Sequence, residues 1–331
     1  RPRRRIKRTS KFEVSKKEHA MGVVFLDVEK ISNLPPLRNK FSKTYDMDPF
    51  VIITFGRRVF KTSWRKHSLN PTYHETVVFE IYENETNFHF HFKVIDRDSF
   101  SYHDNVADGS ISWREMIELQ QREKNSDGFS YELPLTLHDE TVSANCNSKL
   151  YLRFKYVPYQ VLKKQFWERV ISATSTLDSF DIVDLSLFLA NLGTFSDEEV
   201  LGFFYHFNKS PWSHDKLSRE EVVEYFQFWK NSTGFNNVKR CPLCNCHCKS
   251  GRNVLNSKLT LDNDLITHFA ICATGERKIL KPSYVSSDFA SKRWFSKLLI
   301  KLTYGKYALG SNNANILVQD RDTGIVIEEK I

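Results

Sequence analysis

The segment from Phe88 to Val94 alternates between apolar and polar residues at every position. Because successive side chains of a strand point to opposite faces, this pattern predicts a β-strand with its phenylalanines toward a core and with His89 and His91 outward. Residues 150–156 alternate in the same way. An apolar strand face needs a second layer to cover it, so this part of the chain is constrained to a packed β-sheet.

Further β-branched and aromatic runs occupy residues 23–26, 49–56 and 76–81. Clusters of Pro, Asn, Asp and Gly separate them, which is typical of an all-β sandwich made of short strands. We expect this sandwich to span residues 20–158 and to follow a basic tail at residues 1–19.

The apolar spacing becomes helical over residues 159–235, where Ser196 and Ser218 each precede a glutamate by three positions, as in a capping box. We expect four short helices there. Residues 236–280 form a Cys/His segment. Residues 281–331 are predicted to be a linker that contains a helix near 287–302 and a strand at 315–319.

The predicted helices form two pairs that resemble an EF-hand pair, with loops at residues 175–186 and 210–221. Ile182 and Leu217 would lie in the short strand that joins such loops. The loops should bind calcium poorly, because apolar or basic residues stand where oxygen ligands belong: Leu177, Val183, Trp212 and Lys216. The expected role is structural support of the neighbouring domains, and an unrelated four-helix unit is the alternative.

The chain has a net charge of +8, which favours an anionic partner such as a membrane surface or nucleic acid. Much of the excess lies in residues 1–8, which could equally be a solvated linker. The basic run is terminal and no aromatic and basic residues interleave on a strand, so nucleic acid is not expected as a partner. The sequence contains no run of about 18 apolar residues, so it does not predict a membrane-spanning helix.

Acidic residues gather in two segments that flank predicted strands. Several carboxylates held close together repel one another unless a cation lies between them, and calcium prefers six to eight oxygen ligands. The sequence therefore predicts a calcium site formed by Asp46, Asp48, Asp96, Asp98 and Asp104.

Aromatic and apolar residues flank these carboxylates, as expected of loops that insert into a membrane interface. The candidates for insertion are Phe41, Tyr45, Met47, Phe100 and Tyr102. The alternative is that these side chains fold back onto the domain. Lys61, Arg65 and Lys66 are candidates for a basic face that contacts anionic lipid, and a solvated strand edge is the alternative.

Five of the six cysteines lie between residues 241 and 272. Cys241 and Cys244 form a Cys-x-x-Cys pair, and His268 and Cys272 share one face of a short predicted helix. Four nitrogen and sulfur ligands suit a tetrahedral structural zinc ion. The fourth ligand is not unique, because Cys246, His247 and Cys248 lie close by, and reduced thiols or a redox pair are alternatives to zinc.

Residues 20–158 resemble a C2 domain in three motifs: Asp48-Pro49-Phe50, the turn at residues 69–75, and the Asp-x-Asp-x5-Asp loop that begins at Asp96. The C2 family binds calcium between its loops and then docks on anionic phospholipid. The resemblance implies calcium ligands at Asp48, Asp96, Asp98 and Asp104. It departs from the family where Arg38 or Asn39 stands at the first acidic position, for which Asp46 is the nearest replacement.

The order of sandwich, helical pair and Cys/His segment, followed by Leu309 to Arg321, resembles the non-catalytic part of a fungal type-2 phosphatidylserine decarboxylase over about residues 20–331. The resemblance implies that the parent protein continues into a pyruvoyl-dependent catalytic domain, which is outside this chain. Leu309-Gly310-Ser311-Asn312 resembles the self-cleavage motif of that domain but matches the segment before it. We therefore expect no catalytic residue in this chain.

Two functions follow as expectations. The first is calcium-dependent recruitment of a decarboxylase to anionic membranes that contain phosphatidylserine, phosphoinositide or phosphatidic acid, peripherally on the cytoplasmic face of Golgi or endosomal membranes. The second is a calcium-independent scaffold, in which the zinc segment binds a ubiquitin-like partner or a protein tether.

Overall fold

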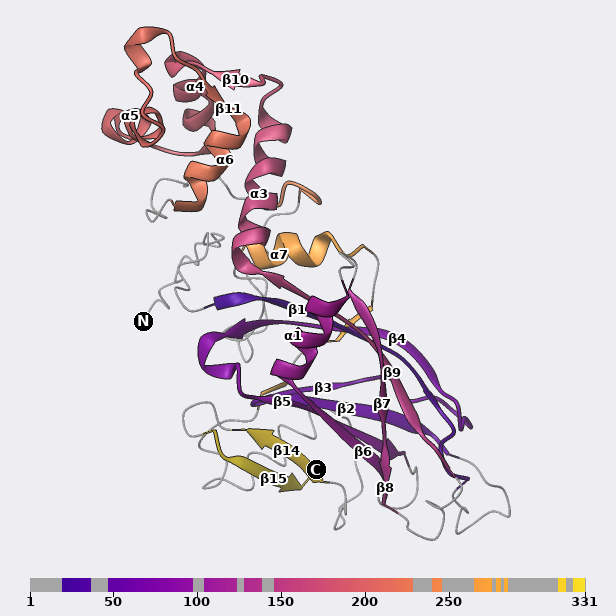
Figure 1. The fold of residues 1–331 in the computed structure, drawn as a ribbon. Coiled ribbons are helices and arrows are strands. Elements are labelled where there is room, and N and C mark those ends of the chain that lie inside the picture. The colour runs from indigo at the N-terminus through magenta and orange to yellow at the C-terminus, as the bar shows by residue number, and fades with distance from the viewer. Residues whose placement is uncertain are drawn as a thin grey trace, which may run out of the picture. The chain divides into compact units, whose positions relative to one another are not determined.

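The architecture is known from a computed structural model of the 331-residue chain. It describes residues 20–36, 47–97, 104–123, 128–138, 146–228, 240–245, 265–275, 278–280, 283–284, 315–319 and 324–330. The chain forms two compact units (Figure 1). The β unit comprises residues 24–156 and 276–331, and the helical unit comprises residues 1–23 and 157–275.

The β unit is a sandwich of two sheets. The five-stranded sheet has the order β12-β4-β1-β9-β7. The bounds of these strands are Lys278–Leu280, Thr72–Tyr82, Ala20–Ser32, Lys149–Pro158 and Phe129–Pro134. The six-stranded sheet has the order β13-β3-β2-β5-β6-β8. Its strands span Ser283–Tyr284, Arg58–Lys61, Pro49–Phe55, His89–Asp96, Asp104–Ser112 and Thr136–Leu137.

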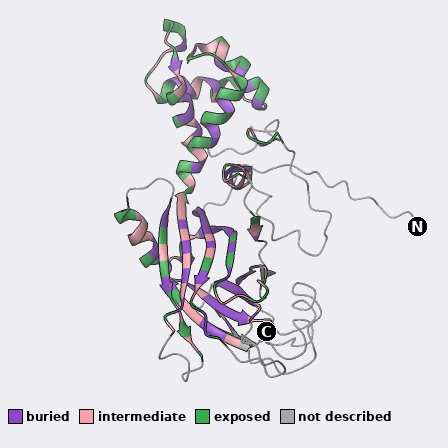
Figure 2. Ribbon diagram, turned by 90° about the vertical axis from the view of Figure 1, so that its right-hand side faces the viewer, coloured by how far each residue is buried: buried purple, intermediate pink, exposed green. Residues whose placement is uncertain are grey.

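The predicted alternation is confirmed in β5, where Phe90 and Phe92 are fully buried and His89 is exposed. These phenylalanines join one core with buried residues of β1, β2, β4 and β9. Figure 2 shows that buried residues make up much of the strands. His91 is half-buried rather than outward. Burial, together with the neighbouring His89, lowers the pKa of His91 to about 4, so this ring is neutral at physiological pH.

Two short helical elements accompany the sandwich within the described part of the chain. The α1 helix spans Trp113–Arg122 and begins at Ser112, whose side chain accepts a hydrogen bond from the Glu115 amide. Trp113 and Met116 of this helix are buried in the core. The 3-10 turn η1 spans Glu83–Glu85.

The β unit also includes a C-terminal hairpin. β14 (Asn315–Gln319) pairs antiparallel with β15 (Val326–Lys330), which confirms the predicted strand at residues 315–319. Its Ile316 and Val318 form a second apolar cluster with residues of the six-stranded sheet: Phe50, Ile52, Val59 and Ile95. The hairpin and β13 show that residues predicted to be a linker contribute strands to the β unit, and β12 shows the same for the last residues of the predicted Cys/His segment.

The helical unit has four main helices, as predicted. They are α3 (Tyr159–Thr174), α4 (Ile182–Leu192), α5 (Asp197–His206) and α6 (Arg219–Phe228). A 3-10 turn, η2 (Pro211–Ser213), precedes α6. Aromatic side chains make the core, in which the ring centroids of Trp167 and Phe226 lie 4.4 Å apart in a stacked arrangement.

The capping boxes predicted for this unit are present. The Ser196 hydroxyl accepts from the Glu199 amide at 3.3 Å, and the Glu199 carboxylate accepts from the Ser196 amide at 2.8 Å. Ser218 and Glu221 exchange equivalent hydrogen bonds at the start of α6. These bonds satisfy amides at helix N-termini that have no partner within the helix.

A two-residue ribbon joins the loops of the helical unit, because β10 (Ser179–Phe180) pairs antiparallel with β11 (Leu217–Ser218). Leu217 therefore has the predicted position. The prediction for Ile182 is wrong, since Phe180 pairs with Leu217 and Ile182 begins α4. Asp181 caps the N-terminus of α4 with its carboxylate, so the extended segment ends at Phe180 and Ile182 is already helical.

A further helix, α7 (Leu265–Cys272), packs on α3, where the rings of Phe166 and Phe269 meet at 5.6 Å in an edge-on arrangement. Leu265 and Ile266 are fully buried. The predicted helix near residues 287–302 lies outside the described residues.

Candidate functional site

The acidic residues converge at one end of the six-stranded sheet. Pro49 of β2 pairs with Asp96 of β5, and Asp96 pairs with Asp104 of β6. Asp48, which immediately precedes β2, therefore lies beside them. The structure thus brings the backbones of three predicted calcium ligands to neighbouring strand ends.

Hydrogen bonds fix the first two carboxylates in place. The Asp96 side chain accepts from the Asp48 amide at 2.7 Å. The Asp48 side chain in turn accepts from the His67 amide at 2.9 Å, and its carboxylate lies 3.7 Å from the His67 ring nitrogen Nδ1. A carboxylate held by backbone amides is preorganised for a cation that needs several oxygen atoms.

The prediction that Met47 inserts into a membrane is wrong. Its side chain is 1 % exposed and packs in the sandwich core, and its carbonyl accepts a hydrogen bond from the Ser68 amide at 3.0 Å. The other predicted residues Asp46, Asp98, Phe41, Tyr45, Phe100 and Tyr102 lie outside the described residues, as does the side chain of Asp104.

The predicted lipid-facing basic residues differ in their surroundings. Lys66 is exposed. The Lys61 ammonium lies 4.2 Å from the centroid of the Phe50 ring, and burial together with the positive charge of Arg97 lowers the pKa of Lys61 to about 8. Lys61 therefore loses part of its charge just above neutral pH.

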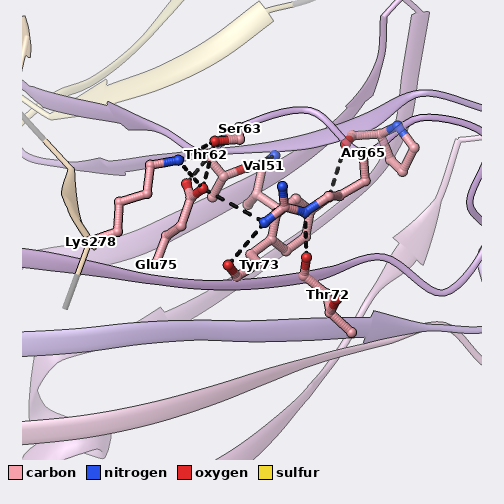
Figure 3. A network of polar contacts seen from close by, with 9 residues as sticks. Val51, Thr62, Ser63, Arg65, Thr72, Tyr73, Glu75 and Lys278 are labelled. Carbon is pink, nitrogen blue, oxygen red and sulfur yellow. Dashed lines mark hydrogen bonds and ion pairs between the residues drawn. The ribbon is translucent and has the colours of Figure 1, made fainter. Parts of the chain in front are cut away.

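Arg65 belongs to a structural network that ties loop residues to β4 (Figure 3). Its guanidinium donates to the carbonyl oxygens of Thr72 and Tyr73, the latter at 3.0 Å. Its Nη2 atom also lies 3.9 Å from the buried carboxylate of Glu75. Arg65 is thus largely committed to holding the turn before β4.

Glu75 links this network to the C-terminal part of the β unit (Figure 3). Its carboxylate is 1 % exposed and accepts from the Lys278 ammonium at 2.6 Å and from the Ser63 amide and hydroxyl at 2.9 and 2.6 Å. Burial acts to raise the pKa of Glu75, but the bonds from Lys278 and Ser63 outweigh it and hold the pKa below its ordinary value. Lys278 thereby fixes β12 alongside β4.

Two residues beside the acidic end were not predicted as site residues. Trp64 is 39 % exposed, and the Arg97 guanidinium lies 4.3 Å from the centroid of its ring. The Arg97 amide donates to the Asp48 carbonyl at 3.0 Å, so this pair adjoins the carboxylates. The sequence held a signal, since Trp64 directly precedes Arg65 and Arg97 lies inside the Asp-x-Asp motif.

A second candidate site lies in the helical unit. The potential ligand atoms of Cys241, Cys244, His268 and Cys272 all lie within 4.8 Å of one another. The His268 ring nitrogen Nε2 is 3.3 Å from the Cys244 sulfur and 3.2 Å from the Cys272 sulfur. Zinc bonds of about 2.1 Å to nitrogen and 2.3 Å to sulfur separate tetrahedral ligands by about 3.5–3.8 Å. The donor atoms lie close enough to this spacing that the cluster could hold a metal ion after small side-chain shifts.

The thiols and the imidazole of the cluster shift one another's pKa. Hydrogen bonding to Cys241 raises the pKa of His268 to about 9. Burial acts to raise the pKa of the Cys241 thiol, but the His268 bond and two amides outweigh it and lower that pKa. Burial and the Cys244 thiol raise the pKa of Cys272. Thiolate and imidazolium thus stabilise each other, and a bound cation would take over that role. The spare candidates Cys246, His247 and Cys248 lie outside the described residues.

None of the helices within the described residues has the length and apolar character that crossing a membrane requires.

Comparison with known proteins gives three results. Residues 22–130 match the C2 domain family. Phosphatidylserine decarboxylase proenzyme 2 of Saccharomyces cerevisiae is 56 % identical over 97 % of this chain and 28 % of its own length. The protein of the same name from Komagataella phaffii is 34 % identical over 93 % of this chain and 36 % of its own length. The chain therefore spans about a third of the length of these relatives.

Among solved structures, a C2 domain of plant extended synaptotagmin 1 is similar at 19 % identity and a TM-score of 0.34. The match covers 42 % of this chain and 96 % of that one.

Proposed function

Since this chain contains a C2 domain and is homologous over nearly its whole length to part of a fungal phosphatidylserine decarboxylase proenzyme 2, we propose that it is the membrane-binding regulatory region of such an enzyme. Its task would be to recruit the enzyme peripherally to anionic membranes, where phospholipid substrate is found. The decarboxylation of phosphatidylserine itself would be carried out by the remainder of the parent protein with its pyruvoyl group. The cytoplasmic face of Golgi or endosomal membranes is the proposed location.

We further propose that recruitment depends on calcium. The observation that supports this is that Asp48 and Asp96 lie side by side at the strand ends, where a backbone amide holds each carboxylate. Bound calcium would supply the positive charge that draws a lipid phosphate to these acidic residues. Asp46, Asp98 and Asp104 are the proposed additional ligands, and Phe41, Tyr45, Phe100 and Tyr102 are the proposed inserting side chains.

Exposed groups beside the acidic end suit an anionic bilayer surface. Lys66 is exposed, and the Arg97 guanidinium is held against the partly exposed Trp64 ring. A tryptophan with a cationic neighbour matches the apolar and charged layers of a membrane interface. We assign Lys66, Arg97 and Trp64 to lipid contact, whereas Arg65 serves mainly to hold the fold.

Co-sedimentation with phosphatidylserine vesicles tests the calcium mechanism. The chain should bind in calcium and be released by a chelator, and Asp48→Asn or Asp96→Asn should abolish the difference. Asp108→Asn is the matched control, because Asp108 lies within β6, away from the strand ends, with its carboxylate 2.5 Å from the His138 ring nitrogen Nε2. Equal binding with and without chelator, or equal loss in the control, would contradict the mechanism.

We propose that Cys241, Cys244, His268 and Cys272 hold a structural zinc ion. The supporting observation is the convergence of one nitrogen and three sulfur donors from a Cys-x-x-Cys turn and from α7. The ion would fasten the turn to the helix, as in small zinc-stabilised modules. Zinc content of the purified chain should be close to one ion per chain and should fall in Cys241→Ser but not in Cys146→Ser.

The Cys/His cluster also supports a second candidate, a calcium-independent scaffold in which the zinc segment binds a ubiquitin-like protein or a tether. Capture of such a partner that survives Asp96→Asn but fails in Cys241→Ser would favour this function. Vesicle binding that fails in Asp96→Asn and survives Cys241→Ser would favour membrane recruitment.

A further inference from the structure

The two loops of the helical unit are each held by a cation of the protein itself. In the loop at residues 175–181, Arg219 is the cation. Its guanidinium donates through Nη2 to the Ser175 carbonyl at 2.8 Å and through Nε to the Leu177 carbonyl. It also lies 3.8 Å from the Asp178 carboxylate. Since Arg219 is the first residue of α6, this contact ties α6 to a loop more than 40 positions earlier in the sequence.

In the loop at residues 207–218, Lys209 is the cation. Its ammonium donates to the Lys216 carbonyl at 2.8 Å and to the Glu221 carboxylate at 2.7 Å. The side chains of Lys209 and Glu221 are 30 % and 24 % exposed, so water screens this pair only in part. A backbone carbonyl together with a glutamate from the following helix is the kind of oxygen pair that a calcium ion uses.

Protein donors also engage the other carboxylates near these loops. Asp181 accepts from the Val183 and Asp184 amides and caps α4. Asp215 accepts from the Ser210 amide at 2.8 Å. Glu221 accepts a second bond from the Ser218 amide at 2.7 Å. A calcium ion would have to displace these donors and would be repelled by the resident ammonium or guanidinium.

The ribbon between β10 and β11 makes the two loops a single structural element. Phe180 and Leu217 pair across it and are fully buried. A change in either loop would therefore disturb the aromatic core, because the Phe180 ring packs 5.5 Å from that of Phe188. The two cations thus stabilise the whole arrangement of helices.

We propose that Lys209 and Arg219 are built-in substitutes for metal ions, which hold the helical unit in one conformation whether or not calcium is present. The unit is then a fixed structural module and not a calcium sensor. It follows that a calcium response of this chain does not arise in these two loops. This inference is independent of the proposed membrane function.

Hydrogen–deuterium exchange of the full chain, with millimolar calcium or a chelator, tests the proposal. In the wild type, calcium should leave the exchange of residues 175–181 and 207–221 unchanged. In Lys209→Met, exchange of residues 207–221 without calcium should be about fivefold faster, a factor equivalent to roughly 1 kcal/mol. Calcium should then slow it, because the Lys216 carbonyl and the Glu221 carboxylate have lost their cation.

Lys216→Met is the matched control, because it removes the same charge from an exposed side chain of the same loop. Residues 207–221 of this variant should exchange at the wild-type rate. Lys209→Arg keeps the positive charge and should also remain insensitive to calcium, which provides a readout if Lys209→Met does not fold. Calcium protection of these loops in the wild type would overturn the proposal. Identical exchange in Lys209→Met and Lys216→Met would overturn it as well.

Discussion

Replacing Ile316 by alanine should destabilise the β unit by about 2.5 kcal/mol. The side chain is 5 % exposed and lies in the cluster with Phe50, Ile52 and Ile95 on the six-stranded sheet. The substitution removes three carbon atoms, each worth about 0.8 kcal/mol when buried, and leaves a small cavity. For a unit of this size the loss corresponds to a fall in melting temperature of ~5–10 °C.

The matched control is Ile327→Ala in the partner strand of the same hairpin. Ile327 pairs with Val318 but is 46 % exposed, so the identical substitution should cost less than about 1 kcal/mol. Calorimetry and urea unfolding of the full chain measure both variants. Equal, small losses would refute the inference that residues 315–319 are an integral part of the sandwich.

Three further predictions follow from the structure. Lys278→Met should lower the free energy of unfolding by about 1 kcal/mol at neutral pH, a modest loss because water screens an ammonium that is 61 % exposed. Acid unfolding of this variant should begin at a higher pH than that of the wild type. The pKa of Glu75 is depressed in the folded chain, so Glu75 contributes its full stabilisation above its ordinary pKa of 4.5 and loses it as the pH falls. Removal of Lys278 raises the folded-state pKa of Glu75. An acid transition that circular dichroism shows to be unchanged would contradict this prediction. In Cys241→Ser, α7 should unfold at a lower temperature than the rest of the chain, and a chelator should have the same effect on α7 of the wild type. Amide hydrogen exchange rates in α7 that do not change would exclude a structural metal. Trp64→Ala should weaken binding to phosphatidylserine vesicles ~5-fold, whereas Trp212→Ala, an equally drastic change at a 72 % exposed ring of the helical unit, should have no effect; equal losses would exclude a specific contact.

The local pattern predicted most of the secondary structure. Strict alternation in residues 88–94 identified β5 and the faces of its phenylalanines, and serine–glutamate spacing identified the starts of α5 and α6. The strand at residues 315–319 was also predicted at its observed bounds. These features depend on neighbours a few positions away, which a sequence displays directly.

The position of β14 on the sandwich could not be predicted in this way. Its contacts with Thr54 and Gly56 join residues more than 250 positions apart, as in the 2.6 Å bond from the Thr54 hydroxyl to the Leu317 carbonyl. No periodicity encodes which sheet a short apolar strand will cover. For the same reason the role of Lys278 at the buried Glu75 carboxylate was not foreseen.

In the candidate sites, too, local spacing could be predicted from the sequence and tertiary packing could not. The spacing of Cys241, Cys244, His268 and Cys272 predicted a cluster that the fold brings together. The prediction for Met47 failed because an apolar residue beside a loop can turn into the core or out to a membrane, and only the tertiary packing decides between them. Lys209 also escaped notice, since its role depends on the carbonyl and carboxylate that the folded loop presents to it.

The function proposed for this chain is the recruitment of its parent protein to anionic membranes. The most direct measurement is co-sedimentation of the wild-type chain with vesicles of phosphatidylcholine alone and with added phosphatidylserine, each in calcium and in chelator. Membrane recruitment predicts binding only to the vesicles with phosphatidylserine, and the calcium mechanism predicts that this binding disappears in chelator. Failure to bind phosphatidylserine vesicles in calcium would rule out membrane recruitment by this chain.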